Sequence, residues 1–451
     1  MADDAIARYH ELLTDEVAAE TQGQLEEQLR RRGLFFGDRP LCTVLRPRFL
    51  SPAQYAYVQR QCAVVLGAFA KVHAAAIDDA GFRAQFGLQG WEERLALADA
   101  RRADPSPLAR LDAFYVTGGA DAGLRLTEYN AETPAGAGYN DALTSLFDAL
   151  PPMRRLRRTY DVRPLPASPG TLDALLDAHA RQFGRAARPR VVILDWREVP
   201  TYSEFVLFER YFREQGVECL IADPREVEYQ GGQLLAGGAP VTLIYKRVLL
   251  SELVERCGEE HAVIRAVRDG VACLVNSFAS KILHKKASLA VLSDERTAHL
   301  FTAGERAAIA EHVPWTRLVA DRRTEYRGEQ VELLAWARDR RDRLVLKPND
   351  EYGGKGIVLG WEVGDAEWEG ALRAALAEPY IIQERIAIPS EPFPSVVDGR
   401  AVFAERMLDT APYVFHGTHV DGVLTRLSTA ALLNVTAGGG SNVPTYVVER
   451  R

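Results

Sequence analysis

Residues 343–361 combine the side chains that proteins use to bind phosphate. Two short apolar runs, 344–346 and 357–359, flank a polar loop, and this pattern predicts a strand, a loop and a second strand. The loop and the end of the first strand supply Lys347, Gly353, Gly354, Lys355 and Gly356. Glycine lets backbone N–H groups approach an anion closely, and lysine adds a positive charge. The stretch therefore indicates a lid over nucleotide phosphates, although a hairpin with a solvated tip fits it equally well.

Oxygen-bearing side chains gather in a predicted hairpin further upstream. Residues 111–116 and 124–130 are expected to be its strands, joined by a glycine-rich turn. Alternation places Leu124, Leu126, Glu128 and Asn130 on one face of the second strand. Carboxylate and amide oxygens at a strand end suit a hard cation, and Asp112 on the partner strand could add another ligand. An edge strand with ordinary polar residues is the alternative reading.

Two more predicted elements carry polar or charged side chains. The strand at 380–386 ends in polar residues that include Gln383 and Glu384. A helix after the strand at 271–275 carries Lys281, Lys285 and Lys286, of which the first two are four residues apart and share a face. A cluster of this kind is typical of a solvated basic face.

The rest of the chain must position these residues. Residues 1–110 are predicted to be mostly helical, with Arg46 and Arg48 as solvated charges in a loop. Residues 151–169 are rich in proline and arginine and are expected to form a surface linker. Strands alternate with helices over 170–260, which predicts a mostly parallel sheet. Polar residues follow its strand ends, where such sheets place ligands, although such residues are equally often turn and cap residues: Asp195, Asp223, Lys246 and Arg247.

Composition limits the classes of function. A chain of 451 residues suggests two or three domains. The net charge of −7 gives no overall basic surface for nucleic acid. Five scattered cysteines without a CxxC pair fit a reducing cytoplasm better than a disulfide framework or a zinc site. No signal peptide is expected at the N-terminus, and no uninterrupted run of 18 apolar residues indicates a membrane span.

Taken together, these features resemble the ATP-grasp superfamily, whose members use ATP to join a carboxylate to an amine or a thiol. Most ATP-grasp chains place Glu-x-Asn after the Gln-Glu strand, whereas here it comes first. That order resembles the circularly permuted ATP-grasp families, which are related to the synthetase domain of glutathionylspermidine synthase. The sequence LTEYNAETP at 126–134 is similar to LEYNADTP of that enzyme. Residues 189–250, and NVTAGGGSNVP at 434–444, which resembles the region that closes the active site, are similar as well.

The resemblance implies roles for individual residues. Magnesium would be bound by Asp112, Glu128 and Asn130. ATP phosphates would be held by Lys347 and by Lys286 or Lys281, of which Lys286 fits the family's helix better. Adenine would be received by Gln383, Glu384 and the backbone of Ile386. The lid would contain Gly353, Gly354, Lys355 and Gly356. Arg426 would lie near the transferred phosphoryl group or the substrate carboxylate, so that Arg426, Lys347 and Lys355 act in catalysis.

We therefore expect an α/β (α+β) chain with a circularly permuted ATP-grasp fold. A helical region (1–110) would precede a metal-binding hairpin segment of the core (111–150), a pre-ATP-grasp-like α/β domain (151–275) and the nucleotide-binding subdomains (276–451). The expected function is a cytoplasmic, ATP- and Mg²⁺-dependent carboxylate–amine ligase that acts on small molecules through an acyl phosphate. Neither nucleic acid nor a membrane is an expected partner. The alternatives are an ATP-grasp kinase and a catalytically inactive nucleotide-binding module.

Overall fold

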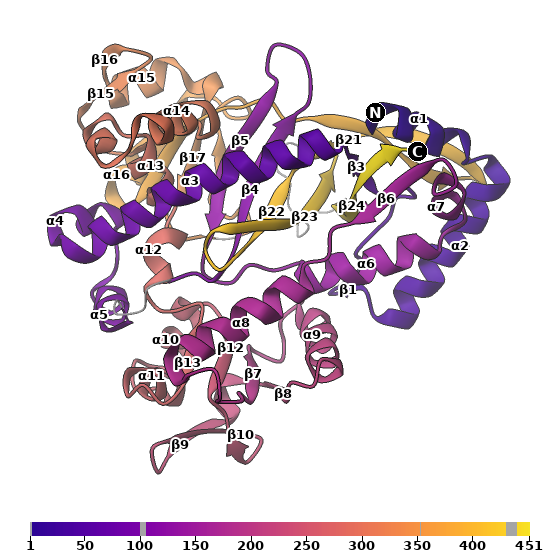
Figure 1. Cartoon of the computed structure of the whole chain (residues 1–451). Coiled ribbons are helices and arrows are strands. Elements are labelled where there is room, and N and C mark those ends of the chain that lie inside the picture. The colour runs from indigo at the N-terminus through magenta and orange to yellow at the C-terminus, as the bar shows by residue number, and fades with distance from the viewer. Residues whose placement is uncertain (1, 100–104, 352, 430–439) are drawn as a thin grey trace.

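The computed structural model describes residues 2–99, 105–351, 353–429 and 440–451. Within these residues, the larger sheets are a parallel four-stranded sheet, an antiparallel four-stranded sheet and a nine-stranded sheet (Figure 1). This mixed architecture confirms the predicted fold class. Most of the segment expected to close the active site, up to Gly439, lies outside the described residues.

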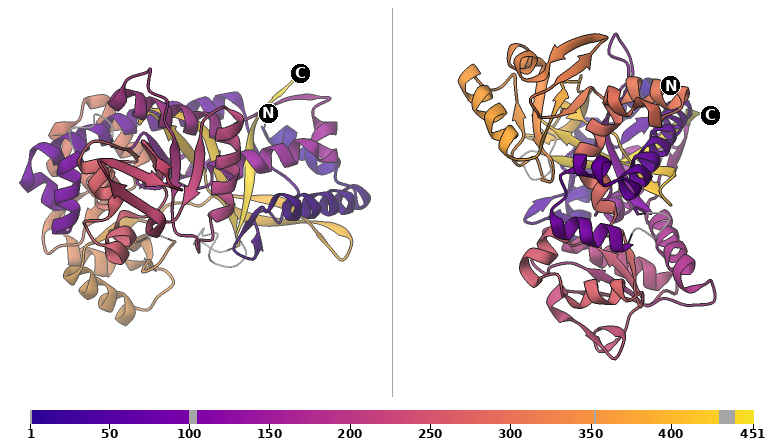
Figure 2. Two further views of the ribbon diagram at one scale, coloured as in Figure 1. Left: turned by 90° about the horizontal axis from the view of Figure 1, so that it is seen from below. Right: turned by 90° about the vertical axis from the view of Figure 1, so that its left-hand side faces the viewer.

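The parallel sheet comes from the middle of the chain, as the alternation of strands and helices predicted. Its order is β13-β12-β7-β8. Its strands and helices are β7 (Val191–Leu194), β8 (Cys219–Ala222), β12 (Leu243–Lys246), β13 (Cys273–Val275), α8 (Ser168–Phe183), α9 (Tyr202–Glu214), α10 (Leu250–Cys257) and α11 (Ala262–Arg268). Strands β7 and β12 are buried along their whole length, as expected where helices cover both faces of a sheet. This unit lies below the rest of the molecule in Figure 1 and in the right-hand view of Figure 2.

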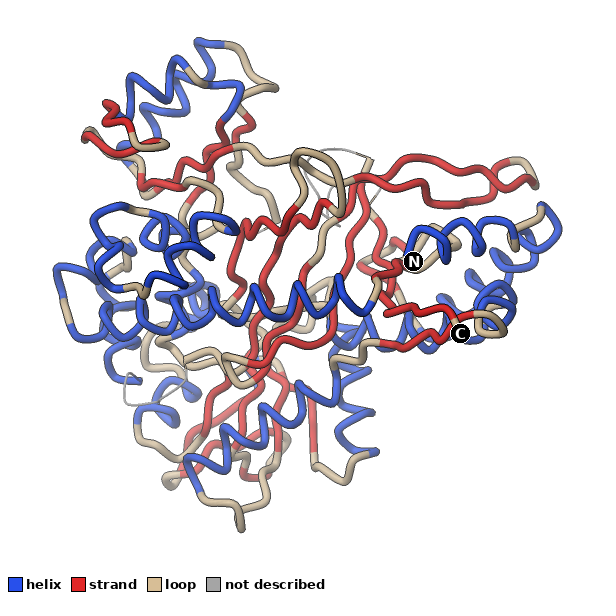
Figure 3. The backbone as a smooth tube through the Cα atoms, turned by 45° about the horizontal axis from the view of Figure 1, so that its top comes forward, coloured by secondary structure: helices blue, strands red, loops and turns tan. Residues whose placement is uncertain are grey.

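The nine-stranded sheet joins segments from the whole length of the chain. Its main path is β20-β21-β23-β22-β4-β5, and β24 pairs with β23, β3 and β6. The strands are β3 (Arg48–Leu50), β4 (Leu108–Val116), β5 (Gly123–Asn130), β6 (Tyr160–Pro164), β20 (Ser390–Val397), β21 (Arg400–Leu408), β22 (Ala411–Phe415), β23 (His419–Ser428) and β24 (Ser441–Arg450). The long β20–β21 hairpin projects from it (Figure 3). Near the hairpin tip, the backbone N–H of Ala401 donates to Asp15 at the start of α2 (Asp15–Arg32).

The antiparallel four-stranded sheet contains the glycine-loop stretch. Its order is β14-β19-β17-β18, with β14 (Thr316–Leu318), β17 (Leu344–Pro348), β18 (Val358–Leu359) and β19 (Tyr380–Glu384). Helices α15 (Leu333–Asp339) and α16 (Asp365–Ala377) pack on it through a core that includes Leu346, Trp368 and Ile382. The predicted strand, loop and strand are therefore present.

Helix α3 (Pro52–Asp78) is the longest described helix, and it packs across the core beside β4 and β5. It starts with the predicted Ser51 cap, and Pro52 is its first residue. By length and composition alone α3 could cross a membrane, and it is the one described helix that passes this test. Its buried side chains, such as Val58, Val65 and Phe69, belong to the main hydrophobic core, which is how a core helix passes the same test.

The remaining described elements surround these layers. The N-terminal part contains α1 (Ala2–Glu11), β1 (Phe35–Phe36), β2 (Arg39–Pro40), α4 (Ala80–Arg83) and α5 (Gly90–Asp99). The middle part contains α6 (Ala137–Ala149), α7 (Pro151–Leu156), β9 (Val227–Gln230), β10 (Gln233–Ala236), β11 (Ala239–Pro240), α12 (Ser280–His284) and α13 (Ala287–Ser293). The last group is α14 (Ala303–His312), β15 (Arg323–Tyr326) and β16 (Glu329–Glu332).

Two sequence predictions outside the site are wrong. Residues 151–169 are not a surface linker, because α7 packs there and β6 pairs with β24 inside the nine-stranded sheet. Arg46 and Arg48 are not solvated, since both side chains are buried. Arg46 forms an ion pair with Glu391 at 2.7 Å, and Arg48 donates to the backbone carbonyl of Asp409 at 2.6 Å. The proline and arginine pattern was misleading because it does not reveal partners that lie hundreds of residues away.

Candidate nucleotide and metal site

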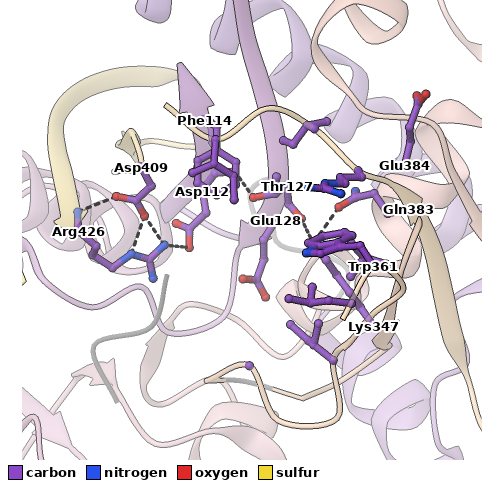
Figure 4. Close-up of a pocket in the computed structure, with 18 of the residues that line it drawn as sticks. Asp112, Phe114, Thr127, Glu128, Lys347, Trp361, Gln383, Glu384, Asp409 and Arg426 are labelled. Atoms are coloured by element: carbon purple, nitrogen blue, oxygen red, sulfur yellow. Dashed lines mark hydrogen bonds and ion pairs between the residues drawn. The ribbon is translucent and has the colours of Figure 1, made fainter. Parts of the chain in front are cut away.

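A cavity lies between the antiparallel sheet and the β4–β5 side of the nine-stranded sheet (Figure 4). The predicted site residues that line it are Asp112, Glu128, Lys347, Gly353, Gly354, Gln383, Glu384, Ile386 and Arg426. The predicted site residues that do not line it are Asn130, Lys281, Lys286, Lys355 and Gly356. The structure thus gathers residues from both halves of the chain at one place.

A β-bulge in β5 aims Glu128 into this cavity. Asp112 pairs with Glu128, but the next residue of β4 pairs with Leu126, so that Thr127 is the extra residue. Leu126 and Tyr129 therefore both point into the main core. The expectation that Leu126 and Glu128 share a face is wrong, because the bulge reverses the alternation between them. Without it, either the leucine or the carboxylate would face the wrong side.

Asp112 sits in a chain of alternating charges. Arg110 donates to its carboxylate at 2.6 and 3.0 Å, and Arg426 lies 2.6 Å from Asp112 and 2.6 Å from Asp409. Figure 4 shows the guanidinium of Arg426 between these two carboxylates. Burial opposes the charge on Asp112, but the two arginines outweigh it and hold the pKa of that carboxyl well below its usual range. The carboxyl of Asp112 is therefore ionised at neutral pH.

Glu128 and Lys286 face each other across the edge of the cavity. The Lys286 ammonium lies 2.8 Å from the Glu128 carboxylate, and it also donates to the backbone carbonyl of Glu351 at 2.6 Å. Burial is the largest influence on the pKa of Glu128 and raises it, but the charge and hydrogen bond of Lys286, together with the charge of Lys347, make the net shift downward. Lys286 does not line the cavity itself, yet it touches the carboxylate that does.

Lys347 connects the two sheets. Its ammonium donates to Gln383 Oε1 on the neighbouring strand at 2.8 Å and to the backbone carbonyl of the bulge residue Thr127 at 3.3 Å. Burial lowers its pKa to about 8, although nearby Glu128 favours the charged form. Gln383 is in turn fixed by its donation to Thr316 Oγ1 at 3.0 Å. Lys347 is therefore held on both sides of the cavity.

The strand β19 forms the other end of the cavity, together with an apolar wall. Glu384 accepts from the hydroxyl of Tyr326 and from Arg327, both at 2.8 Å. The apolar side chains that line the cavity are Ala113, Phe114, Val345, Ile357, Leu359, Trp361, Ile386 and Ile388. The guanidinium of Arg385 lies 4.1 Å from the centre of the Trp361 ring. Such an apolar wall suits the flat face of a heterocyclic ring, such as a nucleotide base.

Comparison with known proteins agrees with this geometry. Residues 101–428 match the family described as circularly permuted ATP-grasp type 2. The chain belongs to this family. It is 26% identical over 348 residues to uncharacterized proteins of Mycobacterium tuberculosis and Mycobacterium bovis, an alignment that covers 73% of this chain but only 58% of those proteins. A solved structure of a glutathione synthetase-like effector from Globodera pallida matches 96% of the chain and 98% of its own length, with a TM-score of 0.62 and 11% identity, which shows the fold. Membership of this family supports an ATP-dependent ligase in general.

The carboxylates of this ATP-grasp site fit a magnesium ion shared with phosphate. Asp112 and Glu128 are directly opposite each other on neighbouring strands and both line the cavity. The described residues hold no group of three His, Cys, Asp or Glu side chains that could bind a metal alone. Two carboxylates are enough when phosphate oxygens and water complete the coordination of Mg²⁺. Asn130 follows on the same strand, but it does not line the cavity.

Some residues of this ATP-grasp site were missed from the sequence. Asp409, Phe114 and Trp361 all line the cavity. Asp409 comes directly after β21, and no local pattern marks it. The alternative of a solvated basic face is wrong for the lysines in and after α12, because Lys281, Lys285 and Lys286 are buried. The useful signal was composition: only seven of the 55 basic residues are lysines, and six of those lie in or beside the site, namely Lys246, Lys281, Lys285, Lys286, Lys347 and Lys355.

We expect the affinity for ATP to fall as the pH rises above about 8. Lys347 has a pKa lowered to about 8 by burial, so its ammonium is mostly charged at pH 7 and loses its proton above pH 8. Only the charged form attracts phosphate. Calorimetric titration with Mg-ATP between about pH 7 and pH 9.5 measures this fall, by up to about tenfold per pH unit.

The matched variant is Lys347→Arg, because arginine stays protonated throughout this range. Its residual affinity is expected to change little with pH. The two neighbouring charges, Glu128 and Lys286, are the same in both proteins. Parallel pH profiles for the wild type and the variant would show that Lys347 is not the titrating group.

Proposed function

We propose that this protein is an ATP-dependent carboxylate–amine ligase that forms an amide bond through an acyl phosphate, with Mg²⁺. The observation that carries the proposal is the cavity in which Lys347 and Gln383 from one sheet meet Asp112 and Glu128 from the other. Family membership supplies the general class of ATP-dependent ligase. The reacting carboxylate and amine belong to small molecules.

Each side of the cavity has a task in this proposal. The apolar wall, Gln383, Glu384 and the backbone of Ile386 receive the adenine, and Lys347 and Lys286 hold the phosphates. Asp112, Glu128 and Asn130 hold Mg²⁺, which neutralises charge on the transferred phosphoryl group. Phosphoryl transfer depends mainly on positioning and charge neutralisation, which these groups provide.

We propose that Arg426 acts in the transfer step. Its guanidinium lines the cavity and is held by Asp409 and Asp112. In our proposal it orients the substrate carboxylate while one of that group's oxygens attacks the γ-phosphorus and ADP leaves. The amine nitrogen then attacks the acyl carbon, the C–O bond to phosphate breaks, the nitrogen loses one proton, which the departing phosphate can accept, and an amide results.

The glycine loop is proposed to cover this reaction. Gly353 and Gly354 line the cavity, with φ angles of 68° and 79° that favour glycine. Lys355 extends outward, with 77% of its side chain exposed, so it can reach phosphate only if the loop folds inward. A closed loop would exclude the water that hydrolyses an acyl phosphate. We place the enzyme in the reducing cytoplasm, since all five cysteines are free.

The experiment that tests the proposal is a search for ADP release. The purified protein is incubated with Mg-ATP and pooled amino acids, peptides and polyamines, and ADP is measured. We expect release that requires both an acid and an amine, and a product whose mass equals their sum minus water. A phosphorylated product formed from one substrate would instead identify a kinase. Binding of ATP without turnover over the whole panel would identify an inactive nucleotide-binding module.

A further inference from the structure

A buried cluster of charges lies beside the nucleotide cavity and has no place in the proposed chemistry. Its members are Glu92 of α5, Glu132 after β5, Lys246 of β12, Lys281 and Lys285 at α12, and Asp350 after β17. Three lysines thus face three carboxylates. Burial lowers the pKa of the adjacent His284 to about 4, so its ring is neutral at neutral pH. The charges therefore balance, as a buried ionic cluster requires.

Asp350 differs from the other members of this cluster. Its side chain is 25% exposed, whereas those of its two partners, Lys281 and Lys285, are at most 3% exposed. One carboxylate oxygen lies 2.8 Å from the Lys281 ammonium, and the other lies 2.6 Å from that of Lys285. Asp350 thus enters the cluster from its edge, at the point where β17 gives way to the glycine loop.

The residues on either side of Asp350 bind Lys286 and Ala287, which come directly after Lys285. The Asn349 carbonyl accepts from the Lys286 backbone N–H at 2.9 Å, and its side-chain oxygen accepts from the Ala287 N–H at 2.8 Å. The Glu351 carbonyl accepts from the Lys286 ammonium at 2.6 Å. The root of the loop is therefore bound to the segment that also holds Glu128 through Lys286.

We propose that Asp350 is a positioning residue that fixes the root of the glycine loop to the buried lysines Lys281 and Lys285, so that the loop amides stay over the cavity. Three positive charges and only two carboxylates would remain if this side chain were neutral. The loop root would then lose its ionic attachment and keep only the neighbouring hydrogen bonds. The role of Asp350 in catalysis rests on the proposed function of the nucleotide site. The attachment of the loop root through Asp350 can be tested without any substrate.

The scarcity of lysine makes a protease that cleaves only after lysine a direct probe of the loop. Lys355 is 77% exposed, and Lys71, at 40%, lies inside helix α3. The remaining lysines are buried or enclosed by the cavity. Cleavage after Lys355 in the native chain of 451 residues, followed by mass spectrometry, therefore reports on opening of this loop.

The test compares Asp350→Asn with Glu351→Gln. Both variants remove one negative charge, at adjacent positions, but among the described residues the Glu351 side chain pairs with the exposed Lys355, at 3.4 Å. We expect Asp350→Asn to be cleaved after Lys355 about tenfold faster than the wild type and Glu351→Gln to stay within about twofold. Asp350→Glu, which restores the charge, should bring the rate back toward that of the wild type. Equal rates for Asp350→Asn and Glu351→Gln would overturn the proposal.

Two further measurements keep the outcomes distinct. If Asp350→Asn unfolded globally, the buried lysines would also be cleaved, and Lys285→Gln then serves as the second variant, with the same selective cleavage expected. A non-hydrolysable ATP analogue with Mg²⁺ should slow cleavage after Lys355 in the wild type and slow it less in Asp350→Asn. An analogue that gives no protection to the wild type would count against the proposed nucleotide site, while a difference between the two charge variants would still establish the attachment of the loop.

Discussion

Replacing Lys347 with methionine is expected to lower ADP formation by on the order of 100-fold or more. The variant removes the ammonium that joins Gln383 on one sheet to the bulge at Thr127 on the other, and with it the proposed fixed phosphate contact. Affinity for Mg-ATP, measured by calorimetry, should fall along with turnover. The matched control is Lys71→Met, because Lys71 forms its ion pair with Glu305, outside the cavity.

The same variant should keep or gain stability. Burial lowers the pKa of Lys347 to about 8 from a usual 10.5, so the charged form is disfavoured in the folded protein. The loss of folding stability that comes from burying this charge is fully present below pH 8. It fades as the pH rises toward 10.5, because the folded protein loses the proton at a lower pH than the unfolded chain does. At pH 7 the midpoint of thermal unfolding should therefore not drop. A variant with full ADP release, or one that loses activity only by unfolding, would contradict the proposed role.

Replacing Glu128 with glutamine is expected to have an effect of similar size. The change keeps the shape of the side chain but removes a carboxylate that faces Asp112 across the strands, and an amide is a weaker ligand for a hard cation. ADP formation should fall by on the order of 100-fold, and the Mg²⁺ concentration that gives half of the maximal rate should rise. The measurement is the rate of ADP formation at saturating ATP as a function of Mg²⁺ concentration.

The control for this variant is Glu332→Gln on β16. Glu332 forms an ion pair with Arg323 in which both side chains are exposed. It should leave both the rate and the Mg²⁺ dependence unchanged. Glu128 also pairs with Lys286 at 2.8 Å, so the variant frees a lysine that is a proposed phosphate contact. A fall in rate without any change in Mg²⁺ dependence would assign Glu128 to the placement of Lys286 rather than to the metal.

Local patterns were sufficient to predict most of the strands that build the site. The structure has β17 and β18 at the apolar runs 344–346 and 357–359, and β19 within the predicted strand at 380–386. Alternation of strands and helices correctly indicated the parallel sheet. These features depend on neighbours in the sequence, and for that reason they can be read from it.

Features that depend on distant partners could not be predicted in this way. The bulge at Thr127 becomes visible only when β5 is laid against β4, and it changes which side chains share a face. Strand β6 looked like a linker because its partner, β24, lies almost 300 residues further along the chain. The lysines at α12 looked solvated because their carboxylate partners Glu92, Glu132 and Asp350 come from three separate segments.

The nine-stranded sheet also sets an order of events during synthesis of the chain. Strands β4 and β5, which carry Asp112 and Glu128, leave the ribosome long before β22, the other neighbour of β4, has been made. The parallel sheet needs only residues 191–275 for its strands and can form in the meantime. Long-range pairing of this kind is slow and leaves strand edges open to wrong partners. The cavity can therefore be completed only after β23, which carries Arg426, has been synthesised, and a nascent chain would acquire nucleotide binding only after that point.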